Sequence, residues 1–294
     1  MLRTCFALMM AVVALLAARP AQSETLACTP IASLPATLTT QGVYCLDRDL
    51  STALIEGSAI TIAANNITLD CNGHALVGTA YLPATRANGI FAADRFNLTV
   101  RNCQVRGFYR GLSLDGVNGG GHLFEDNAFA HIAATGIRAQ GDGMVIRRNT
   151  IHDVGGTNAG NKPTGMQLVG NSLQVLDNRV AGVVSSTLNV FGLYVSGNAP
   201  RVAGNEFLRL QSAVVWGMYL VEGEAPPLQA IVEGNVVMAS GSNGLAGGSP
   251  QHLADPQGAS LCRDNAYLGF DGSWLVPGSG AINDCIDGGG NVIR

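Results

Sequence analysis

Residues 136–151 read "GIRAQGDGMVIRRNTI", and both halves of this stretch recur along the chain. The first half is a glycine followed by an apolar, a variable and a small or apolar residue. It returns as "GIFA" at 89, "GLSL" at 111, "GIRA" at 136, "GMQL" at 165, "GLYV" at 192, "GMYL" at 217 and, more weakly, "GLAG" at 244. A unit that recurs in this way is typical of repeat architectures.

The second half has the pattern apolar-x-x-Asn-x-apolar. Its asparagines are Asn127, Asn149, Asn178, Asn205, Asn235 and Asn265. The apolar residues three before them are Phe124, Ile146, Val175, Val202, Val232 and Cys262. Those two after them are Phe129, Ile151, Val180, Phe207, Val237 and Tyr267. The same register assigns Val100, Cys103 and Val105 to the second coil, and Leu69, Asn72 and an inward-pointing His74 to the first.

Each unit alternates with a period of two over a few residues, which predicts short strands rather than helices. One coil cannot bury its apolar side alone, whereas stacked coils form a continuous core. We expect the repeated asparagine at a sharp corner, because asparagine tolerates the left-handed backbone conformation. Its amide can also hydrogen-bond from coil to coil. The sequence therefore predicts an all-β solenoid.

Over about residues 55 to 270 this pattern resembles the right-handed parallel β-helix family with pectate-lyase-like architecture, and "ITLDCNGHALVG" at 67–78 resembles the opening coil of exported members. The resemblance implies one domain, 24–294, of about eight to nine coils. Residues 24–57 are expected to form an N-terminal cap, 58–270 the coils and 271–294 a C-terminal cap, with disulfides linking the caps. The fold hosts lyases, hydrolases, epimerases and adhesins, so it does not by itself imply an activity.

The first 23 residues have the pattern of a signal peptide: Arg3, an apolar core and a small-residue cleavage site. We therefore expect an exported protein, periplasmic or extracellular, without a transmembrane segment in the mature chain.

Its six remaining cysteines allow 15 pairings. Proximity and repeat register favour Cys28–Cys45, Cys71–Cys103 and Cys262–Cys285. Because no C-x-x-C spacing occurs, no structural zinc site is predicted. Neither another metal site nor a cofactor is expected.

Composition excludes one class of partner. Charged residues make up 13% of the chain and its net charge is −4. A nucleic-acid-binding protein needs a basic surface, so no nucleic-acid partner is expected. The oligomeric state is not predicted.

Three outward-facing groups are candidate sites, because stacking turns equivalent positions into columns. The position two after each glycine reads Phe91, Ser113, Arg138, Gln167, Tyr194 and Tyr219. Tyrosine rings stack on sugars, and Arg and Gln bind hydroxyls or carboxylates. Arg138, Gln167, Tyr194 and Tyr219 are therefore the predicted ligand-binding residues, with ordinary aromatic packing on a solvent-facing sheet as the alternative.

A second column lies two residues before each corner and reads Asp70, Arg101, Glu125, Arg147, Leu176, Ala203, Glu233 and Arg263. Its first four members alternate in charge, as do Asp126, Arg148 and Asp177 in the next column. Such alternation favours ion pairing across coils. Paired carboxylates have lowered pKa values, so they make poor general acids.

The third group follows the corner. His131 and Asp153 occupy equivalent positions in adjacent coils, His152 lies beside them, and the loop before Lys162 brings the only lysine into this region. A His–Asp pair can support general-base chemistry. These four residues are candidate catalytic residues, with solvated polar surface as the alternative.

Three functions follow from these groups. The first is an exported β-helix that binds carbohydrate or a cell-envelope polysaccharide along an outward strand face. The second is a polysaccharide lyase or glycoside hydrolase. The third is a structural or assembly protein of the periplasm. The paired-Asp, Gly-His-Gly and Asp-Pro-His signatures of related enzymes are absent, so no activity is assigned.

Overall fold

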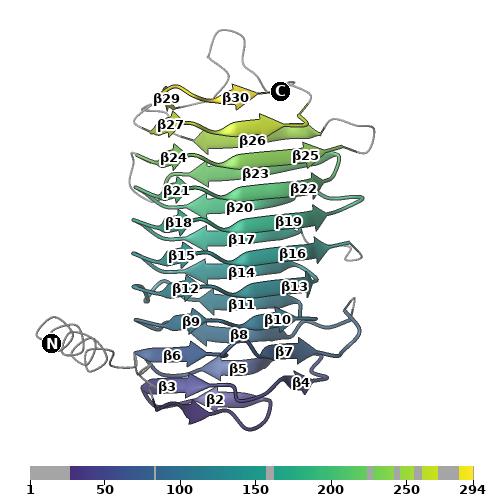
Figure 1. The fold of residues 1–294 in the computed structure, drawn as a ribbon, viewed down its shortest axis with the longest axis vertical. Coiled ribbons are helices and arrows are strands. Elements are labelled where there is room, and N and C mark those ends of the chain that lie inside the picture. Colours follow the sequence, from purple (N-terminus) through teal and green to yellow (C-terminus); the bar gives the residue numbers. More distant parts are fainter. Residues whose placement is uncertain are drawn as a thin grey trace, which may run out of the picture.

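A computed structural model describes residues 27–82, 84–156, 162–223, 228–241, 246–254, 260–270 and 285–293. The expected signal segment, the start of the weak repeat at 244 and most of the expected C-terminal cap lie outside these residues. The described chain winds into stacked coils, and each complete coil contributes one strand to each of three parallel sheets (Figure 1). Within this part of the chain, no helix is long and apolar enough to cross a membrane.

The three sheets are named A, B and C. Sheet A comprises β1 (Thr29–Pro30), β3 (Gly42–Cys45), β6 (Ile67–Asp70), β9 (Thr99–Arg101), β12 (Leu123–Glu125), β15 (Val145–Arg147), β18 (Gln174–Leu176), β21 (Arg201–Ala203), β24 (Ile231–Glu233), β27 (Leu261–Arg263) and β29 (Ile286–Asp287). Sheet C comprises β4 (Leu50–Thr52), β7 (Ala75–Gly78), β10 (Gln104–Arg106), β13 (Ala128–Ile132), β16 (Thr150–Gly155), β19 (Arg179–Val184), β22 (Glu206–Gln211), β25 (Val236–Ser240), β28 (Ala266–Leu268) and β30 (Val292–Ile293). Sheet B comprises β2 (Ala36–Leu38), β5 (Ser58–Ile62), β8 (Asn88–Ala93), β11 (Arg110–Asp115), β14 (Thr135–Gln140), β17 (Thr164–Val169), β20 (Val190–Ser196), β23 (Val214–Val221) and β26 (Gly247–Ala254).

The apolar positions of the repeat form the core between the three sheets. Phe124, Ile146 and Val175 align across β12, β15 and β18, and all three are fully buried. Phe129 and Ile151 align in the same way on sheet C and are also fully buried. The predicted parallel solenoid is confirmed, and the nine strands of sheet B agree with the predicted number of coils.

The repeated glycine is needed because the backbone passes close to both the core and the next coil. A Cβ added at Gly136 would lie 2.5 Å from Ile151 Cγ2 and 2.7 Å from the Gly165 carbonyl oxygen. At Gly165 it would lie 2.4 Å from Val180 Cγ1 and 2.5 Å from the Gly192 oxygen. Close-packed interiors do not accommodate such contacts, so a side chain here would push adjacent coils apart.

The repeated asparagines form a buried hydrogen-bonded ladder at the corner between sheets A and C. Asn178 Oδ1 accepts from Asn149 N and from Asn149 Nδ2, both at 3.0 Å. Asn178 Nδ2 donates to the Ile146 carbonyl at 2.8 Å. The pattern repeats at Asn127, Asn205, Asn235 and Asn265, and Asn291 adds a further rung. The predicted hydrogen bonding from coil to coil is confirmed.

The expected left-handed conformation of these asparagines is wrong. The residue directly before each rung has the positive φ instead, as in Arg148 (52°) and Asp177 (54°). Each ladder asparagine has to point its side chain inward to hydrogen-bond with neighbouring coils. The sharp turn of the backbone is therefore made by the residue before it. Asn72 of the first coil, which lies outside the ladder, does have a φ of 51°.

The expected inward position of His74 is also wrong. Leu69 aligns with Val100, and Leu76 rather than His74 aligns with Val105. Leu76 comes seven residues after Leu69, whereas Val105 comes five residues after Val100. The corner of the first coil is therefore two residues longer than that of the second. Leu76 fills the core, and His74 turns outward, where its Nδ1 lies 3.4 Å from Asp49 Oδ1.

All three predicted disulfides are present: Cys28–Cys45, Cys71–Cys103 and Cys262–Cys285. The second links the coils that contain β6 and β9. Strands from both expected caps join the three sheets: β3 pairs with β6 at one end, and β27 pairs with β29 at the other.

Candidate functional site

The outward face of sheet B carries the predicted ligand-binding residues in one column. Strand pairing aligns Arg138 with Gln167, Gln167 with Tyr194, and Tyr194 with Tyr219. The same column continues through β26 at His252, which aligns with Tyr219. All five side chains are partly exposed. The predicted alignment is therefore confirmed.

Five aromatic side chains gather at the β20–β26 end of this face. We define Phe191, Tyr194, Trp216, Tyr219 and His252 as the aromatic platform. The Tyr194 and Tyr219 rings are stacked 5.6 Å apart with an interplanar angle of 8°, and Tyr219 stacks on His252 at 4.6 Å. Trp216 meets Tyr219 edge-on at 5.1 Å. The rings form one continuous, partly exposed surface.

Sequence reasoning found only the two tyrosines of this platform. Phe191 and Trp216 stand directly before the repeated glycine, in "FGLY" and "WGMY". Strand pairing aligns these two residues, and their rings are stacked 6.3 Å apart. The available signal was the aromatic residue directly before the glycine. It occurs only in the coils that carry a tyrosine two residues after the glycine.

The β8–β14 part of the face is cationic. Arg138 is ion-paired with Asp115, and burial, together with the charge of Arg110, lowers the pKa of its guanidinium. Arg110 and Arg86 flank the Tyr109 ring, at 5.2 and 4.8 Å from its centroid. Such cation–π contacts hold both side chains in place. Arginine groups thus stand at one end of the face and aromatic rings at the other, with Gln167 between them.

A groove runs beside the column, over the turns that leave sheet B. We call this hollow of about 660 Å³ the sheet B groove. Gln140, Val169 and Ser196, each two residues beyond a member of the column, form one wall. Polar side chains form a second wall, where Asp142 Oδ1 accepts from Asn171 N at 2.7 Å. Amide and hydroxyl groups therefore line a channel parallel to the stacked rings.

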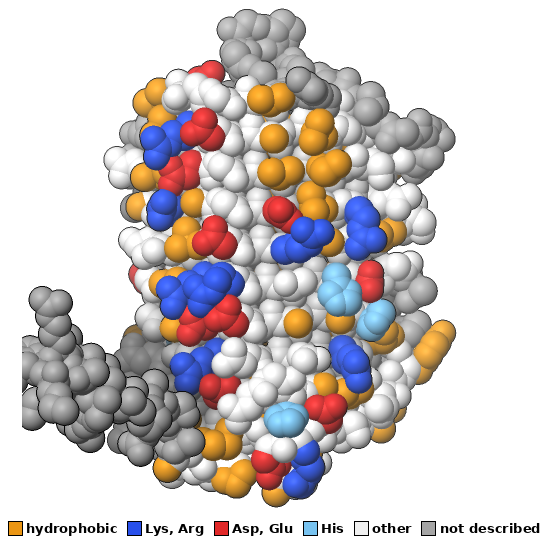
Figure 2. Space-filling view, viewed as in Figure 1, with side chains coloured by type: hydrophobic (Ala, Val, Ile, Leu, Met, Phe, Trp, Pro, Cys, Tyr) orange, Lys and Arg blue, Asp and Glu red, His pale blue; other side chains and the backbone are white. Residues whose placement is uncertain are grey.

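The charged column on sheet A is structural, as predicted. Arg101 pairs with Asp70 at 2.8 Å and Arg147 with Glu125 at 2.7 Å. Blue and red side chains form a vertical band over this sheet (Figure 2). Hydrogen bonding to Arg148 lowers the pKa of Asp126. The paired side chains lie on adjacent coils and so support the register between them.

Further ion pairs lie along the same sheet. Glu233 pairs with Arg201 at 2.6 Å and Arg263 at 2.5 Å, and hydrogen bonds from Arg201 and then Arg263 lower its pKa. The pKa of Asp70 is also lowered. Burial raises it, but hydrogen bonds from Asn72 and other neighbours outweigh that effect. Exposed pairs of this kind are worth about 0–1 kcal/mol each.

The structure brings three of the four candidate catalytic residues together on sheet C. Asp153 Oδ2 accepts a hydrogen bond from His152 Nδ1 at 3.0 Å and lies 3.7 Å from His131 Nδ1. The two imidazoles meet edge-on at 6.0 Å. The fourth residue, Lys162, is exposed, and its backbone carbonyl accepts from Thr164 Oγ1. Within the described chain, no three His, Cys, Asp or Glu side chains are placed to hold a metal ion.

Comparison with known proteins identifies the repeat. A family model described as "Right handed beta helix region" matches residues 88–252, more than half of the 294 residues. No curated protein matches the sequence.

Solved structures with a similar chain path include three carbohydrate-active proteins. An alginate lyase from Paenibacillus sp. str. FPU-7 has 13% identity and a TM-score of 0.45, over 76% of this chain and 91% of that one. A mannuronan C-5 epimerase A-module from Azotobacter vinelandii has 14% identity and a TM-score of 0.33, over 86% and 79%. The catalytic domain of a GH87 alpha-1,3-glucanase in complex with nigerose has 12% identity and a TM-score of 0.35, over 92% and 60%. At these identities the likeness concerns the fold alone.

Proposed function

The chain belongs to the right-handed β-helix family, and from this premise we propose that it is an exported protein that binds a polysaccharide along the outward face of sheet B. The aromatic platform and the sheet B groove together form the binding face. The expected signal segment and the three disulfides support export, since disulfides persist in oxidising compartments.

The observation that carries this proposal is the partly exposed stacked platform. Tyr194, Tyr219 and His252 lie on successive coils, about 4.8 Å apart along the sheet. These rings cover one another's faces, so they present a row of ring edges at this spacing, against which successive sugar rings of an extended chain can pack their apolar C–H faces. The adjoining amides and hydroxyls of the groove can then bind sugar hydroxyls. Ordinary aromatic packing on a solvent-facing sheet is the alternative, and the polar groove beside the rings favours ligand binding over it.

The proposal is tested with the double variant Tyr194→Ala/Tyr219→Ala in affinity electrophoresis. A glycan array on the mature protein first selects the polysaccharide. We expect the double variant to lose retention in gels that contain this polysaccharide while its melting temperature stays close to that of the wild type. The control, Tyr81→Ala, removes an exposed tyrosine outside the platform and should leave retention unchanged. Equal retention of the double variant and the wild type would rule out binding at the platform.

Catalysis on the bound chain is the alternative that this face also permits, because Arg138 and Gln167 stand beside the platform. Incubation with a panel of uronic-acid polysaccharides separates the two functions. Unsaturated products, seen by their absorbance, would indicate a lyase, and new reducing ends without that absorbance would indicate a hydrolase. A binding protein produces neither.

A further inference from the structure

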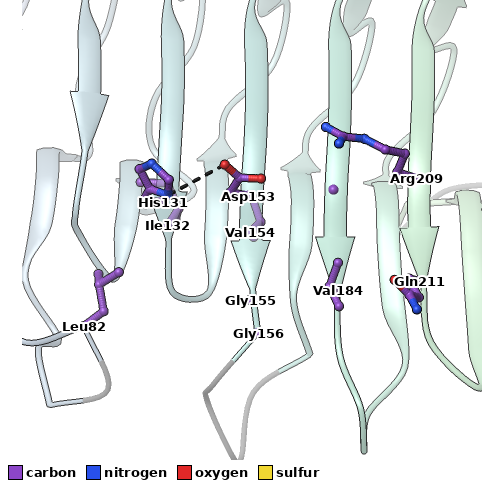
Figure 3. Close-up of a pocket in the computed structure, with 11 residues that line it drawn as sticks. Leu82, His131, Ile132, Asp153, Val154, Gly155, Gly156, Val184, Arg209 and Gln211 are labelled. Atoms are coloured by element: carbon purple, nitrogen blue, oxygen red, sulfur yellow. Dashed lines mark ion pairs between the residues drawn. The ribbon is translucent and has the colours of Figure 1, made fainter.

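A second recess lies on sheet C, outside the aromatic platform and the sheet B groove. Its volume is about 360 Å³, and its lining includes Leu82, His131, Asp153, Gly182 and Arg209 (Figure 3). Four of these residues come from four successive sheet C strands, β13, β16, β19 and β22. We call this hollow the sheet C recess.

The recess is built on a column of left-handed backbone positions. Gly107, His131, Asp153, Gly182 and Arg209 occupy equivalent places, and all have a positive φ between 51° and 79°. Glycine takes this conformation without strain, whereas a bulky residue such as arginine does so at a cost in free energy. Two coils use glycine here and three carry chemically active side chains. At three of these five positions the side chain is therefore His, Asp or Arg, although glycine fits the same backbone conformation.

Gly182 leaves an empty position between two charged groups of opposite sign. A Cβ on Gly182 would lie 3.3 Å from Asp153 Oδ1 and 3.9 Å from Arg209 Nη2. Figure 3 shows the Arg209 side chain reaching from its own strand toward the neighbouring strand on the Asp153 side. The carboxylate and the guanidinium thus border the same gap from opposite sides.

The other side of the carboxylate is held in place. Asp153 Oδ2 faces both imidazoles, at 3.0 Å from His152 Nδ1 and 3.7 Å from His131 Nδ1. This arrangement leaves Oδ1 directed at the gap over Gly182. Leu82 and Val184 supply apolar surface to the same recess.

We propose that the sheet C recess is a separate binding site for one neutral sugar residue. The carboxylate only accepts hydrogen bonds and the guanidinium only donates them, so a group between them has to do both, as a hydroxyl does. Because Asp153 and Arg209 carry opposite charges on the two sides of the gap, this pair gives no net attraction for an anionic ligand. The volume lies at the lower end of the range for small-molecule sites, which favours a single sugar over a chain. The apolar C–H face of the sugar would pack against Val184.

Saturation-transfer difference NMR on the mature protein tests this site with methyl glucopyranoside, methyl galactopyranoside, methyl mannopyranoside and glucuronate as probes. We expect signal from at least one neutral glycoside, together with a shift of the His131 ring resonances. Gly182→Asn fills the gap with a residue that tolerates a positive φ, and it should abolish the His131 shift and the part of the signal that comes from the recess. Arg209→Met keeps the aliphatic chain, removes the donors and should weaken affinity about tenfold or more.

The matched control is Gly143→Asn. Gly143 also has a left-handed φ, of 64°, but a Cβ there would meet nothing within 4 Å and it lies outside the recess. This variant should bind as the wild type does. Tyr194→Ala/Tyr219→Ala should retain the shift of the His131 ring resonances, because that shift reports on the recess alone, and this separates the recess from the proposed platform. The proposal is overturned if no neutral glycoside gives a signal, if Gly182→Asn binds as well as Gly143→Asn, or if glucuronate binds better than every neutral probe.

Discussion

His122 is the clearest case of a single residue whose environment changes its chemistry. It is 2% exposed, lies stacked on Phe124, and its Nδ1 accepts a hydrogen bond from the Leu98 N–H at 3.2 Å. Burial lowers the pKa of its imidazole from 6.5 to about 4. Protonation would place a charge in the core and remove the acceptor, so the folded protein holds His122 neutral.

This pKa predicts a loss of stability in mild acid. The unfolded chain takes up a proton near pH 6.5 and the folded chain only near 4, so the contribution of His122 is complete above 6.5 and is lost as the pH falls toward 4. Between about pH 7 and about pH 5 the free energy of unfolding should drop by about 2 kcal/mol through this residue. Urea unfolding at both pH values measures the drop.

The comparison variant is His122→Gln, which keeps an acceptor that does not titrate in this range. Its stability should change less between the two pH values than that of the wild type. His74→Gln, at a half-exposed imidazole, should retain the full drop. An identical pH dependence in the wild type and His122→Gln would contradict the assignment.

Prediction from sequence was reliable for residues within strands and poor for residues in corners. Tyr194 and Tyr219 could be aligned because strand positions repeat with a fixed offset from the glycine. His74 could not, because a corner can absorb two extra residues while the strands on either side keep their pairing. The φ of Asn149 was mispredicted for a related reason: propensity indicates that asparagine tolerates a turn, but not which of two adjacent corner residues makes it.

At the scale of elements, the asparagine ladder connects the coils at the corner where the strands of sheet A end and those of sheet C begin. Replacing Asn178 by Ala removes the acceptor for the Asn149 N–H and the donor for the Ile146 carbonyl, both of which are buried. Each unpaired buried group costs about 1–3 kcal/mol. We therefore expect Asn178→Ala to lower the free energy of unfolding by about 2–5 kcal/mol, measured by urea unfolding.

The control rung is Asn291, at the end of the ladder. It accepts from Asn265 N at 3.0 Å but is partly exposed, so water can replace its hydrogen bonds. Asn291→Ala should cost about 1 kcal/mol or less. Equal losses at Asn178 and Asn291 would mean that the ladder does not hold the coils together in the way described.

The candidate sites were predictable only in part, for reasons that also lie at this scale. The column through Arg138, Gln167 and the tyrosines follows from one repeated position. Trp216 joins the platform from a neighbouring position on the same strand, so it was missed when one column was considered alone. Arg209 was missed because it lies two coils from Asp153, across the space that Gly182 leaves on the coil between them.

At the scale of the whole molecule, the Cys71–Cys103 disulfide closes a loop with a sequence separation of 32 residues and joins two coils near the N-terminal end. Closing a loop of this length stabilises by about 3–4 kcal/mol in the chain-entropy account. Cys71→Ala/Cys103→Ala should lose about this free energy of unfolding. Calorimetry of the variant and the wild type measures the loss, and an unchanged melting temperature would contradict it.

The proposed function requires an outward aromatic surface that contacts a polysaccharide directly. Trp216 lies in that surface, and the only other tryptophan of the chain is Trp274. Trp274→Phe therefore makes fluorescence a probe of Trp216 alone. On titration with the polysaccharide selected by the glycan array, we predict a saturable change in Trp216 emission. Binding of the same polysaccharide with no change in that emission would contradict the account.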